Sequence, residues 1–275
     1  MTIENLLRNK VAIITGASRG IGKATALIFA KAGASVVLAA RSSDDLVALA
    51  EEIKAGGSHA LAIPTDVTSQ ADVDWLITST MRAFRQIDIL VNNAGVLNPI
   101  GKTWEVHPDE WQRLIRINVI GPYLCARAVL PQMLDRGDGR IINVSSGAAN
   151  SDILGWSAYC VSKAALNRFT TTLAAEVAHT AIAVTAMNPG ATDTKMQADI
   201  RQTTNAAFAR GDHFRQLHAE GRLHPPEDPA QLILWLASEF GQGQNGVILN
   251  LDDLRVREQI AADLGLPHIP TRRET

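Results

Sequence analysis

Tyr159 and Lys163 stand four residues apart in a segment with helical character, so their side chains share one face of a helix. A tyrosine, with an ordinary pKa of about 10, is a poor base at neutral pH, but a neighbouring ammonium favours the phenolate and is expected to lower that pKa. Such a pair is suited to moving a proton to or from an alcohol oxygen. Most tyrosine and lysine pairs of this kind are ordinary surface residues, so the neighbouring motifs must show whether this pair is catalytic.

A glycine-rich turn lies near the N-terminus. It reads TGASRGIG over residues 15–22, follows a short apolar run and opens a helical pattern. Its glycines, Gly16, Gly20 and Gly22, allow a tight turn and let a pyrophosphate approach the N–H groups at a helix N-terminus. Glycine-rich turns are common, but the position between the first strand and the first helix favours a phosphate cradle over a plain turn.

The end of the second predicted strand carries no acidic residue. Enzymes that use NAD place an Asp or Glu at this point to bind the ribose hydroxyls. Here Ala40 stands there and Arg41 follows. A guanidinium is suited to a 2′-phosphate, and Arg19 in the cradle adds a second positive charge. Both arginines can instead be solvated surface groups, but without a competing acid we expect NADP(H) in preference to NAD(H).

The bulk composition is that of an ordinary globular protein. The 275 residues suffice for one large α/β domain; 46% of them are hydrophobic and 20% are charged. A net charge of −2 gives no reason to expect binding to nucleic acid or to an anionic membrane. No apolar run reaches the roughly 20 residues that span a bilayer, so we expect a cytoplasmic protein without membrane contact. Cys125 and Cys160 are interpreted as free thiols.

Apolar strand patterns alternate with helical patterns along the chain. We predict strands at residues 11–14, 35–40, 59–63, 89–91, 140–144, 183–187 and 246–251, and helices at 21–32, 46–55, 73–84, 110–134, 158–178 and 229–240. This alternation predicts a parallel sheet with helices on both faces, and apolar strands fit burial from both sides. The expected fold is α/β, a single-domain doubly wound (Rossmann-like) nucleotide-binding unit over residues 1–275.

Two segments depart from this alternation. Residues 195–226 are polar and form either a lid over a substrate or a surface helix pair. We favour the lid because the segment follows the strands and helix that carry the candidate catalytic residues. Residues 252–275 are a C-terminal extension in which Leu254, Ile260 and Leu264 give an uneven apolar face. That face packs either on a partner subunit or on its own domain.

Four motifs in order resemble the short-chain dehydrogenases/reductases over roughly residues 10–194. They are the cradle, the Asn92-Asn93-Ala94-Gly95 sequence after a strand, Ser146 thirteen residues before the tyrosine, and Tyr159-x-x-x-Lys163. The resemblance implies an NAD(P)(H)-dependent oxidoreductase that acts on a small-molecule carbonyl or secondary alcohol and assembles as a homodimer or homotetramer. It also implies hydride transfer at a nicotinamide.

The resemblance further implies roles for a catalytic set. Ser146 would bind the substrate oxygen and Tyr159 would act as the acid/base. Lys163 would hold the nicotinamide ribose and lower the tyrosine pKa, and Asn118 would help to carry a water-linked proton relay. Ser145 is the rival serine, but its spacing of fourteen residues from the tyrosine favours a structural neighbour.

Cofactor contacts follow from the cradle, the strand ends and the resemblance. Asp66 resembles the family's adenine-binding acid, Asn92 would line the cofactor channel, and Thr194 is the expected contact to the nicotinamide amide. The full set of expected contacts is Gly16, Ser18, Arg19, Gly20, Ile21, Gly22, Arg41, Ser42, Asp66, Val67, Asn92, Ala94, Gly95, Tyr159, Lys163, Pro189, Gly190, Thr192 and Thr194. Each of them has an alternative interpretation as a turn or cap residue.

Three histidines and one tryptophan are also of interest. His213, His218 and His224 fit no zinc spacing, so we expect solvated histidines and no metal site. Trp156, with Ile153 and Leu154, is predicted to give the pocket an apolar side and to favour a substrate with apolar surface.

The C-terminus departs from the family pattern. The family often ends a last strand in Asp-Gly-Gly, whereas this chain reads Asp252-Asp253-Leu254, which leaves the transfer of oligomer contacts open. Two functional alternatives also stay open. One is the reduction of 3-oxoacyl thioesters, and the other is a non-catalytic NADP(H)-binding regulator, which has no need of a complete catalytic set.

Overall fold

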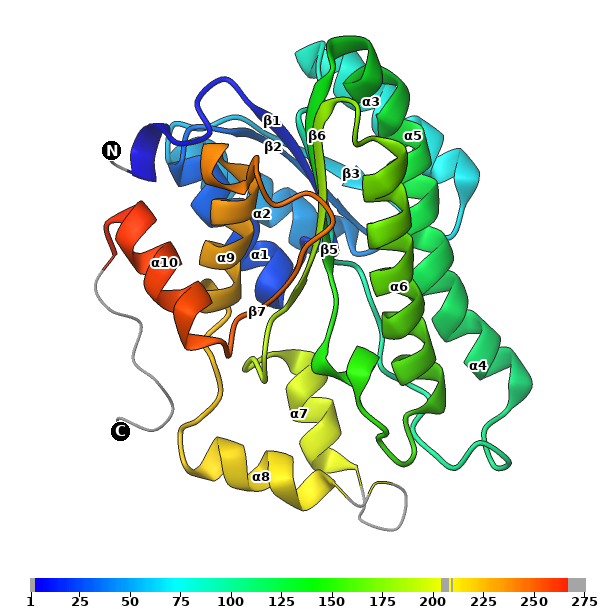
Figure 1. Ribbon diagram of the computed structural model, residues 1–275. Helices are drawn as coiled ribbons and strands as arrows, with labels where there is room; N and C mark the ends of the chain where they lie inside the picture. Colours follow the sequence, from blue (N-terminus) through cyan, green and yellow to red (C-terminus); the bar gives the residue numbers. More distant parts are fainter. Residues whose placement is uncertain (1–2, 204–207, 209, 267–275) are drawn as a thin grey trace.

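A parallel sheet forms the centre of the molecule (Figure 1). The computed structural model describes residues 3–203, 208 and 210–266. Within them the sheet has seven strands in the order β3-β2-β1-β4-β5-β6-β7. The strands are β1 (Val11–Thr15), β2 (Ser35–Ala40), β3 (Ala60–Pro64), β4 (Ile89–Asn92), β5 (Asp138–Val144), β6 (Ala181–Asn188) and β7 (Ile248–Asn250). The order reverses between β1 and β4, which opens a crevice at the carboxyl ends of these strands.

Helices cover both faces of the sheet, as the sequence predicted (Figure 1). One face carries α1 (Gly20–Lys31), α2 (Ser43–Ala55) and α9 (Glu227–Ala237), and the other carries α3 (Gln70–Phe84), α5 (Gly121–Arg136) and α6 (Ser157–Glu176). Successive residues of β1 point to opposite faces, so Ile14 joins the core under α1 and Ile13 joins the core under α3. Burial on both sides explains why this strand is apolar throughout.

A single long helix is interrupted by a wider turn. α4 (Pro108–Ile115) continues through a π-helical turn, η2 (Arg116–Ile120), into α5. Pro122 has no N–H to donate to the Asn118 carbonyl four residues earlier, which favours the local change in hydrogen bonding. The π-helical turn therefore contains Asn118, the residue expected to take part in a proton relay.

By length and mean hydropathy alone this continuous helix, Pro108–Arg136, resembles a membrane span. Its Cys125, Val129 and Met133 side chains are, however, buried in the core between the sheet and the helices that flank it. Such packing is typical of a core helix.

The polar segment predicted at 195–226 contains two short helices. α7 (Lys195–Gln202) and α8 (Gly211–Ala219) lie beyond the carboxyl ends of the strands (Figure 1). Short 3-10 turns lie at η1 (Ile3–Asn5), η3 (Gly147–Asn150) and η4 (Glu239–Gly241). The turn η3 follows β5 and leads toward α6.

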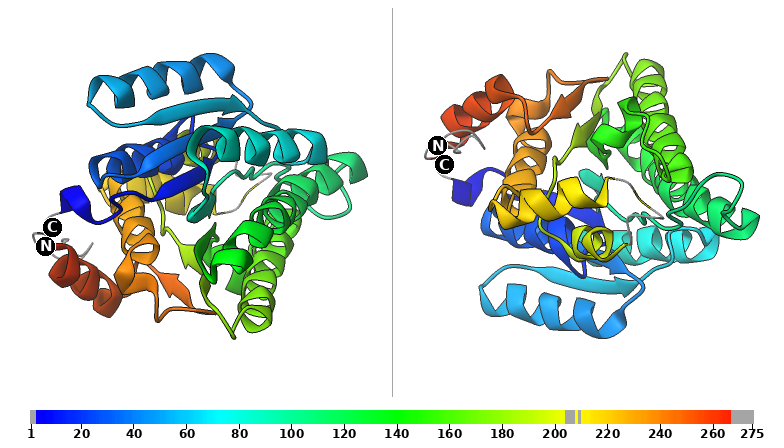
Figure 2. Two further views of the ribbon diagram at one scale, coloured as in Figure 1. Left: turned by 90° about the horizontal axis from the view of Figure 1, so that it is seen from above. Right: turned by 90° about the horizontal axis from the view of Figure 1, so that it is seen from below.

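The C-terminal extension packs on its own domain. It forms α10 (Leu254–Leu264), which lies beside α9 in both views of Figure 2. Ile260 and Leu264 are buried in the core under α9, and Trp235 Nε1 donates a hydrogen bond to Asp263 Oδ2 at 2.7 Å. Of the two possibilities left open by the sequence, the structure therefore shows packing within the chain.

Candidate active site

A cleft of about 760 Å³ lies at the crevice where the strand order reverses. Many of the expected cofactor contacts line it, and they come from the cradle, the ends of β2, β3 and β4, helix α6 and the segment after β6. They are Gly16, Ser18, Arg19, Gly20, Ile21, Arg41, Ser42, Asp66, Val67, Ala94, Gly95, Tyr159, Lys163, Pro189 and Thr194. Residues about 180 positions apart in sequence thus meet in one groove.

The cradle requires glycine at two of its positions. Gly16 has φ +66°, and a Cβ there would lie 2.9 Å from the Ala94 Cα. A Cβ at Gly22 would lie 2.2 Å from the Gly16 carbonyl oxygen, so Gly22 packs the turn and does not line the cleft. The bare backbone beside a helix N-terminus fits the diphosphate of a dinucleotide.

Asn93, and not Asn92, faces the cleft. Asn92 ends β4, is buried in the sheet, and its Nδ2 donates to Asn143 Oδ1 at 2.9 Å. The expectation that its side chain lines the cofactor channel is corrected here. Asn93 lines the cleft, and its Nδ2 donates to the carbonyls of Thr15 at 2.9 Å and Gly16 at 3.1 Å. Strand alternation decides which of two neighbouring asparagines turns inward.

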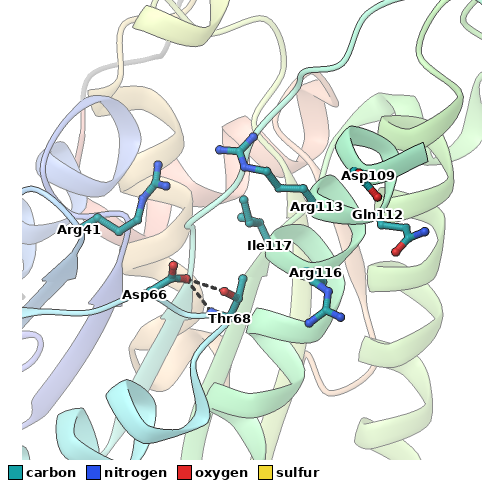
Figure 3. Close-up of a pocket in the computed structure, with 8 residues that line it drawn as sticks. All are labelled: Arg41, Asp66, Thr68, Asp109, Gln112, Arg113, Arg116 and Ile117. Carbon is teal, nitrogen blue, oxygen red and sulfur yellow. Dashed lines mark hydrogen bonds between the residues drawn. The ribbon is translucent and has the colours of Figure 1, made fainter. Parts of the chain in front are cut away.

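Two arginines face one opening at the far end of the cleft (Figure 3). Arg41, after β2, and Arg113, from α4, extend toward the same space, with Asp66 beside Arg41. Asp66 Oδ1 accepts hydrogen bonds from the Thr68 N–H at 2.9 Å and the Thr68 hydroxyl at 2.8 Å. The sequence analysis missed Arg113, because nothing local indicates that α4 returns to the end of β2.

Tyr159 is buried at the opposite end of the cleft. Burial raises the pKa of Tyr159 to about 12, although a hydrogen bond with the Ser146 side chain acts to lower it. Ser146 Oγ also accepts from the Ala148 N–H at 3.2 Å. Ser145, the rival serine, lines the cleft, but its hydroxyl donates to Asn167 Oδ1 at 2.6 Å. The geometry therefore favours Ser146 as the partner of Tyr159.

Lys163 is also buried, and its environment corrects one expectation. Its Nζ donates to the Val144 carbonyl at 2.8 Å and lies 5.7 Å from the centre of the Tyr159 ring. Burial lowers the pKa of Lys163 to about 8. The prediction that this ammonium lowers the tyrosine pKa is not met, because burial of the phenol raises that pKa and the group that acts to lower it is Ser146.

Asn118 connects the loop after β4 to α6. Its Oδ1 accepts from the Val96 N–H at 2.9 Å, and its Nδ2 donates to the Val96 carbonyl at 2.8 Å and to Ser162 Oγ at 3.1 Å. A Cβ at Gly95 would lie 3.4 Å from Asn118 Oδ1 and 3.8 Å from Lys163 Nζ. Gly95 therefore keeps the space between these two groups open.

The segment after β6 forms the remaining wall. Thr194 lines the cleft, and its Oγ1 accepts from the Gln197 N–H at the start of α7. Thr192 is buried and donates to the Pro189 carbonyl at 2.9 Å, while Gly190, with φ +65°, faces His224. The expected contacts Gly190 and Thr192 thus shape the turn behind the wall and do not line the cleft itself.

His224 was expected to be solvated, and that expectation is wrong. Only 4% of its side chain is exposed, and its ring nitrogens lie 3.1 Å from Asp228 Oδ2 and 2.9 Å from Asp252 Oδ1. Nothing in the sequence indicated Asp252, which lies 28 residues away after β7, whereas the i,i+4 spacing of His224 and Asp228 was a local signal that the sequence analysis missed.

An aromatic stack covers the tyrosine. Trp156 packs edge-on against Tyr159 at 5.4 Å and stacks on Phe208 at 4.8 Å and on Phe214 at 5.8 Å between ring centres. The two phenylalanines come from the segment around α8 and were missed by the sequence analysis. Leu154, predicted to face the pocket, is 78% exposed instead.

A glycine cradle at the reversal of a parallel sheet, with a buried tyrosine and lysine across the groove, defines a dinucleotide-binding oxidoreductase. A sequence model described as short chain dehydrogenase matches residues 10–205. The chain belongs to the short-chain dehydrogenase/reductase family.

Known proteins similar to this chain span nearly its full length. It is 37% identical over 252 residues to short chain dehydrogenase/reductase astE of Aspergillus oryzae, with 90% of this chain and 94% of that protein covered. It is 38% identical over 234 residues to a 3-oxoacyl-(acyl-carrier-protein) reductase of Synechocystis sp., with 85% and 91% covered. A crystal structure of 3-ketoacyl-(acyl-carrier-protein) reductase from Brucella melitensis complexed with NADH has a TM-score of 0.78 at 34% identity, with 89% and 97% covered.

Proposed function

We propose that the protein reduces a carbonyl compound to a secondary alcohol with NADPH, and that it catalyses the reverse oxidation with NADP⁺. The position of Tyr159 carries this proposal: it lines the same cleft as the glycine cradle, next to Lys163. Its phenol is protonated at neutral pH, as in any tyrosine, and burial raises its pKa further, so it is a proton donor. A carbonyl oxygen needs such a donor as it gains negative charge. When bound, the reduced nicotinamide supplies hydride to the carbonyl carbon.

Three polar side chains near Tyr159 have tasks around that oxygen. Ser146 donates a hydrogen bond to the substrate oxygen, and Tyr159 donates the proton. Lys163 binds the ribose hydroxyls through its ammonium group. Asn118 helps to relay protons from solvent to Lys163. Pro122 has no N–H to donate to the backbone carbonyl of Asn118, and this supports a bridging water at that carbonyl.

NADP(H) is the proposed cofactor. Arg41, Arg19 and Ser42 line the same end of the cleft, and Ala40 offers no carboxylate that would repel a 2′-phosphate. The Thr68 hydrogen bonds orient Asp66 for an adenine amino group. Pro189 and Thr194 then face the nicotinamide. The Brucella structure contains NADH, so a direct comparison of both cofactors decides the preference.

The substrate side of the cleft supports an apolar carbonyl compound. Leu97 and Met196 line it, and Trp156 with Phe208 closes the space beyond Tyr159. Both Met196 and Phe208 belong to the segment 195–226, which we propose as a lid over the substrate. Small polar polyols and apolar ketones should therefore differ as substrates, and equal turnover of the two would count against this assignment.

The direct test is absorbance at 340 nm with purified protein, NADPH or NADH, and a panel of ketones, aldehydes and 3-oxoacyl thioesters. We expect oxidation of NADPH with one substrate class and a lower catalytic efficiency with NADH. Equal efficiency with both cofactors would contradict the roles of Arg41 and Arg19. Binding of NADPH without turnover of any substrate would instead favour the regulator alternative, which has no need of a complete catalytic set.

Reduction of 3-oxoacyl thioesters is the second candidate function. Its specific support is the 38% identity to the Synechocystis reductase over 234 residues. In the panel, a 3-oxoacyl thioester should then be turned over with a higher kcat/KM than a simple ketone of equal length. The reverse ranking would remove this candidate.

We further propose a cytoplasmic homodimer or homotetramer. Ile120 and Tyr123 next to and in α5, and Val161 in α6, expose between 42% and 48% of their surface. Tyr123 packs edge-on against Phe169 at 6.2 Å, so these two helices present one apolar face. Light scattering of the purified protein tests this, and a monomer at micromolar concentration would contradict it.

A further inference from the structure

His224 occupies a point where three parts of the chain meet. It lies between α8 and α9, with one ring nitrogen 3.1 Å from Asp228 Oδ2 on α9 and the other 2.9 Å from Asp252 Oδ1 after β7. Both ring nitrogens thus lie within hydrogen-bond distance of an aspartate oxygen, and the buried ring bridges α9 and the end of β7.

The His224 backbone makes a second set of contacts. Its N–H donates to the Ala191 carbonyl at 2.8 Å, and its carbonyl accepts from the Asp193 N–H at 2.8 Å. The bridge pairs His224 with Thr192 in a parallel sense. The two ends of the segment 195–223 are therefore joined at this residue, next to the wall that carries Pro189 and Thr194.

A polar network extends from this point toward the catalytic serine. Asn250 Oδ1 accepts from the Asp252 N–H at 3.1 Å and from Asn188 Nδ2 at 3.0 Å. Asn188 Oδ1 in turn accepts from the Gly190 N–H at 3.1 Å. A Cβ at Gly147, the residue after Ser146, would lie 3.3 Å from Asn188 Nδ2. The Pro189–Thr194 wall is thus joined through Gly190 to Asn188, which lies next to Gly147, the residue after Ser146.

The geometry points to His224 as a positioning residue for the reaction, which clamps the Pro189–Thr194 wall and the base of the 195–223 segment through Asp228 and Asp252. This inference rests on the proposed function, in which that wall faces the nicotinamide. His224 touches neither the cleft nor the reacting atoms and acts through the wall.

The test separates the two halves of the cofactor. His224→Ala and Asp252→Asn are compared with Asp253→Asn, which changes the neighbouring aspartate that caps α10, and with His218→Ala, an exposed histidine on α8. We measure kcat, the Kd of NADPH, and the Kd of adenosine 2′,5′-bisphosphate, which probes the distant half only.

We expect the two clamp variants to lower kcat and to weaken NADPH binding at least tenfold, while adenosine 2′,5′-bisphosphate binds within twofold of the wild type. The two control variants should match the wild type. Loss of both affinities together would indicate general unfolding and would overturn the inference, as would unchanged kcat and NADPH affinity. Asp252→Asn keeps the side-chain size, so it answers the question if His224→Ala does not fold.

Hydrogen exchange makes the inference independent of activity. The amides of residues 190–194 should exchange at least tenfold faster in Asp252→Asn than in Asp253→Asn, and equal rates would overturn the clamp. If the wild type neither binds NADPH nor turns over a carbonyl, the proposed function fails, yet this exchange difference still reports on His224. The two failures are therefore distinguishable.

Discussion

The two ends of the cleft are built differently. At the nicotinamide end, the side chains of Asn118, Tyr159 and Lys163 are buried, and each has a hydrogen-bond partner within the chain. At the adenine end, Arg19, Arg41 and Arg113 are exposed. Folding fixes the side chains at the nicotinamide end, whereas the three arginines keep their rotamer freedom until they bind a phosphate group.

Because of this difference, the nicotinamide end determines catalysis and the adenine end determines which cofactor is preferred. A buried group is shifted by desolvation, as the pKa values of Tyr159 at about 12 and Lys163 at about 8 show. An exposed arginine in water is screened by salt and acts by charge. We therefore expect changes at the buried end to alter kcat and changes at the exposed end to alter KM for the cofactor.

The largest effect should come from Tyr159→Phe, which removes the proton donor and leaves the ring. General acid catalysis contributes about 10² to 10⁴ in rate, so turnover should fall by at least about 10³. NADPH affinity should stay within twofold, because the hydroxyl serves proton transfer more than binding. Steady-state assays at 340 nm and a fluorescence titration measure the two quantities. Turnover close to that of the wild type would contradict the assigned mechanism.

A matched pair of serines sharpens the assignment within the buried end. Ser146→Ala removes the partner of Tyr159 and should lower kcat by about 10², in line with the loss of one oxyanion donor. Ser145→Ala breaks the hydrogen bond to Asn167 and should cost about 1–3 kcal/mol of stability with a far smaller loss of turnover. The reverse order of kcat values would transfer the catalytic role to Ser145.

The exposed end is tested by Arg41→Ala. Loss of a hydrogen bond between charged groups costs about 1.5–3 kcal/mol, so KM for NADPH should rise by about 10-fold to 100-fold. KM for NADH should change little, and kcat should stay near that of the wild type. Arg82→Ala is the control, because Arg82 is an exposed arginine in the last turn of α3 that lines neither this opening nor the cleft. Equal losses with NADPH and NADH would show that Arg41 does not read the phosphate.

The smallest expected effect is a pH dependence from Lys163. Burial lowers its pKa to about 8, so the ammonium is lost as pH rises through that value, while Tyr159 stays protonated. The kcat/KM for reduction should therefore fall by up to about tenfold per pH unit above pH 8. A profile that stays flat to pH 9.5 would argue that Lys163 need not be charged in the free enzyme.

Sequence patterns within short segments predicted the features that depend on neighbouring residues alone. The turn of residues 15–22, the spacing of Tyr159 and Lys163, and the apolar strands gave the doubly wound sheet and most residues that line the cleft. Element boundaries moved by a few residues, as in β7, predicted at 246–251 and found at Ile248–Asn250.

The errors came from contacts between distant segments and from burial. Asp252, one partner of His224, lies 28 residues away after β7, and Phe208 meets Trp156 across more than fifty residues. Asn92 was preferred to Asn93 because the sequence does not show which face of β4 turns inward. The direction of the Tyr159 shift depended on how deeply its hydroxyl is buried, which no spacing reveals.

The central claim is that this cleft transfers a hydride to a carbonyl carbon while Tyr159 donates the proton. The most direct measurement uses NADPH with deuterium at C4 on its transferable face and the substrate found in the panel, with mass spectrometry and NMR of the product. We predict one deuterium on the former carbonyl carbon and none on the oxygen after exchange in water. Product without deuterium, or deuterium released to solvent, would contradict hydride transfer.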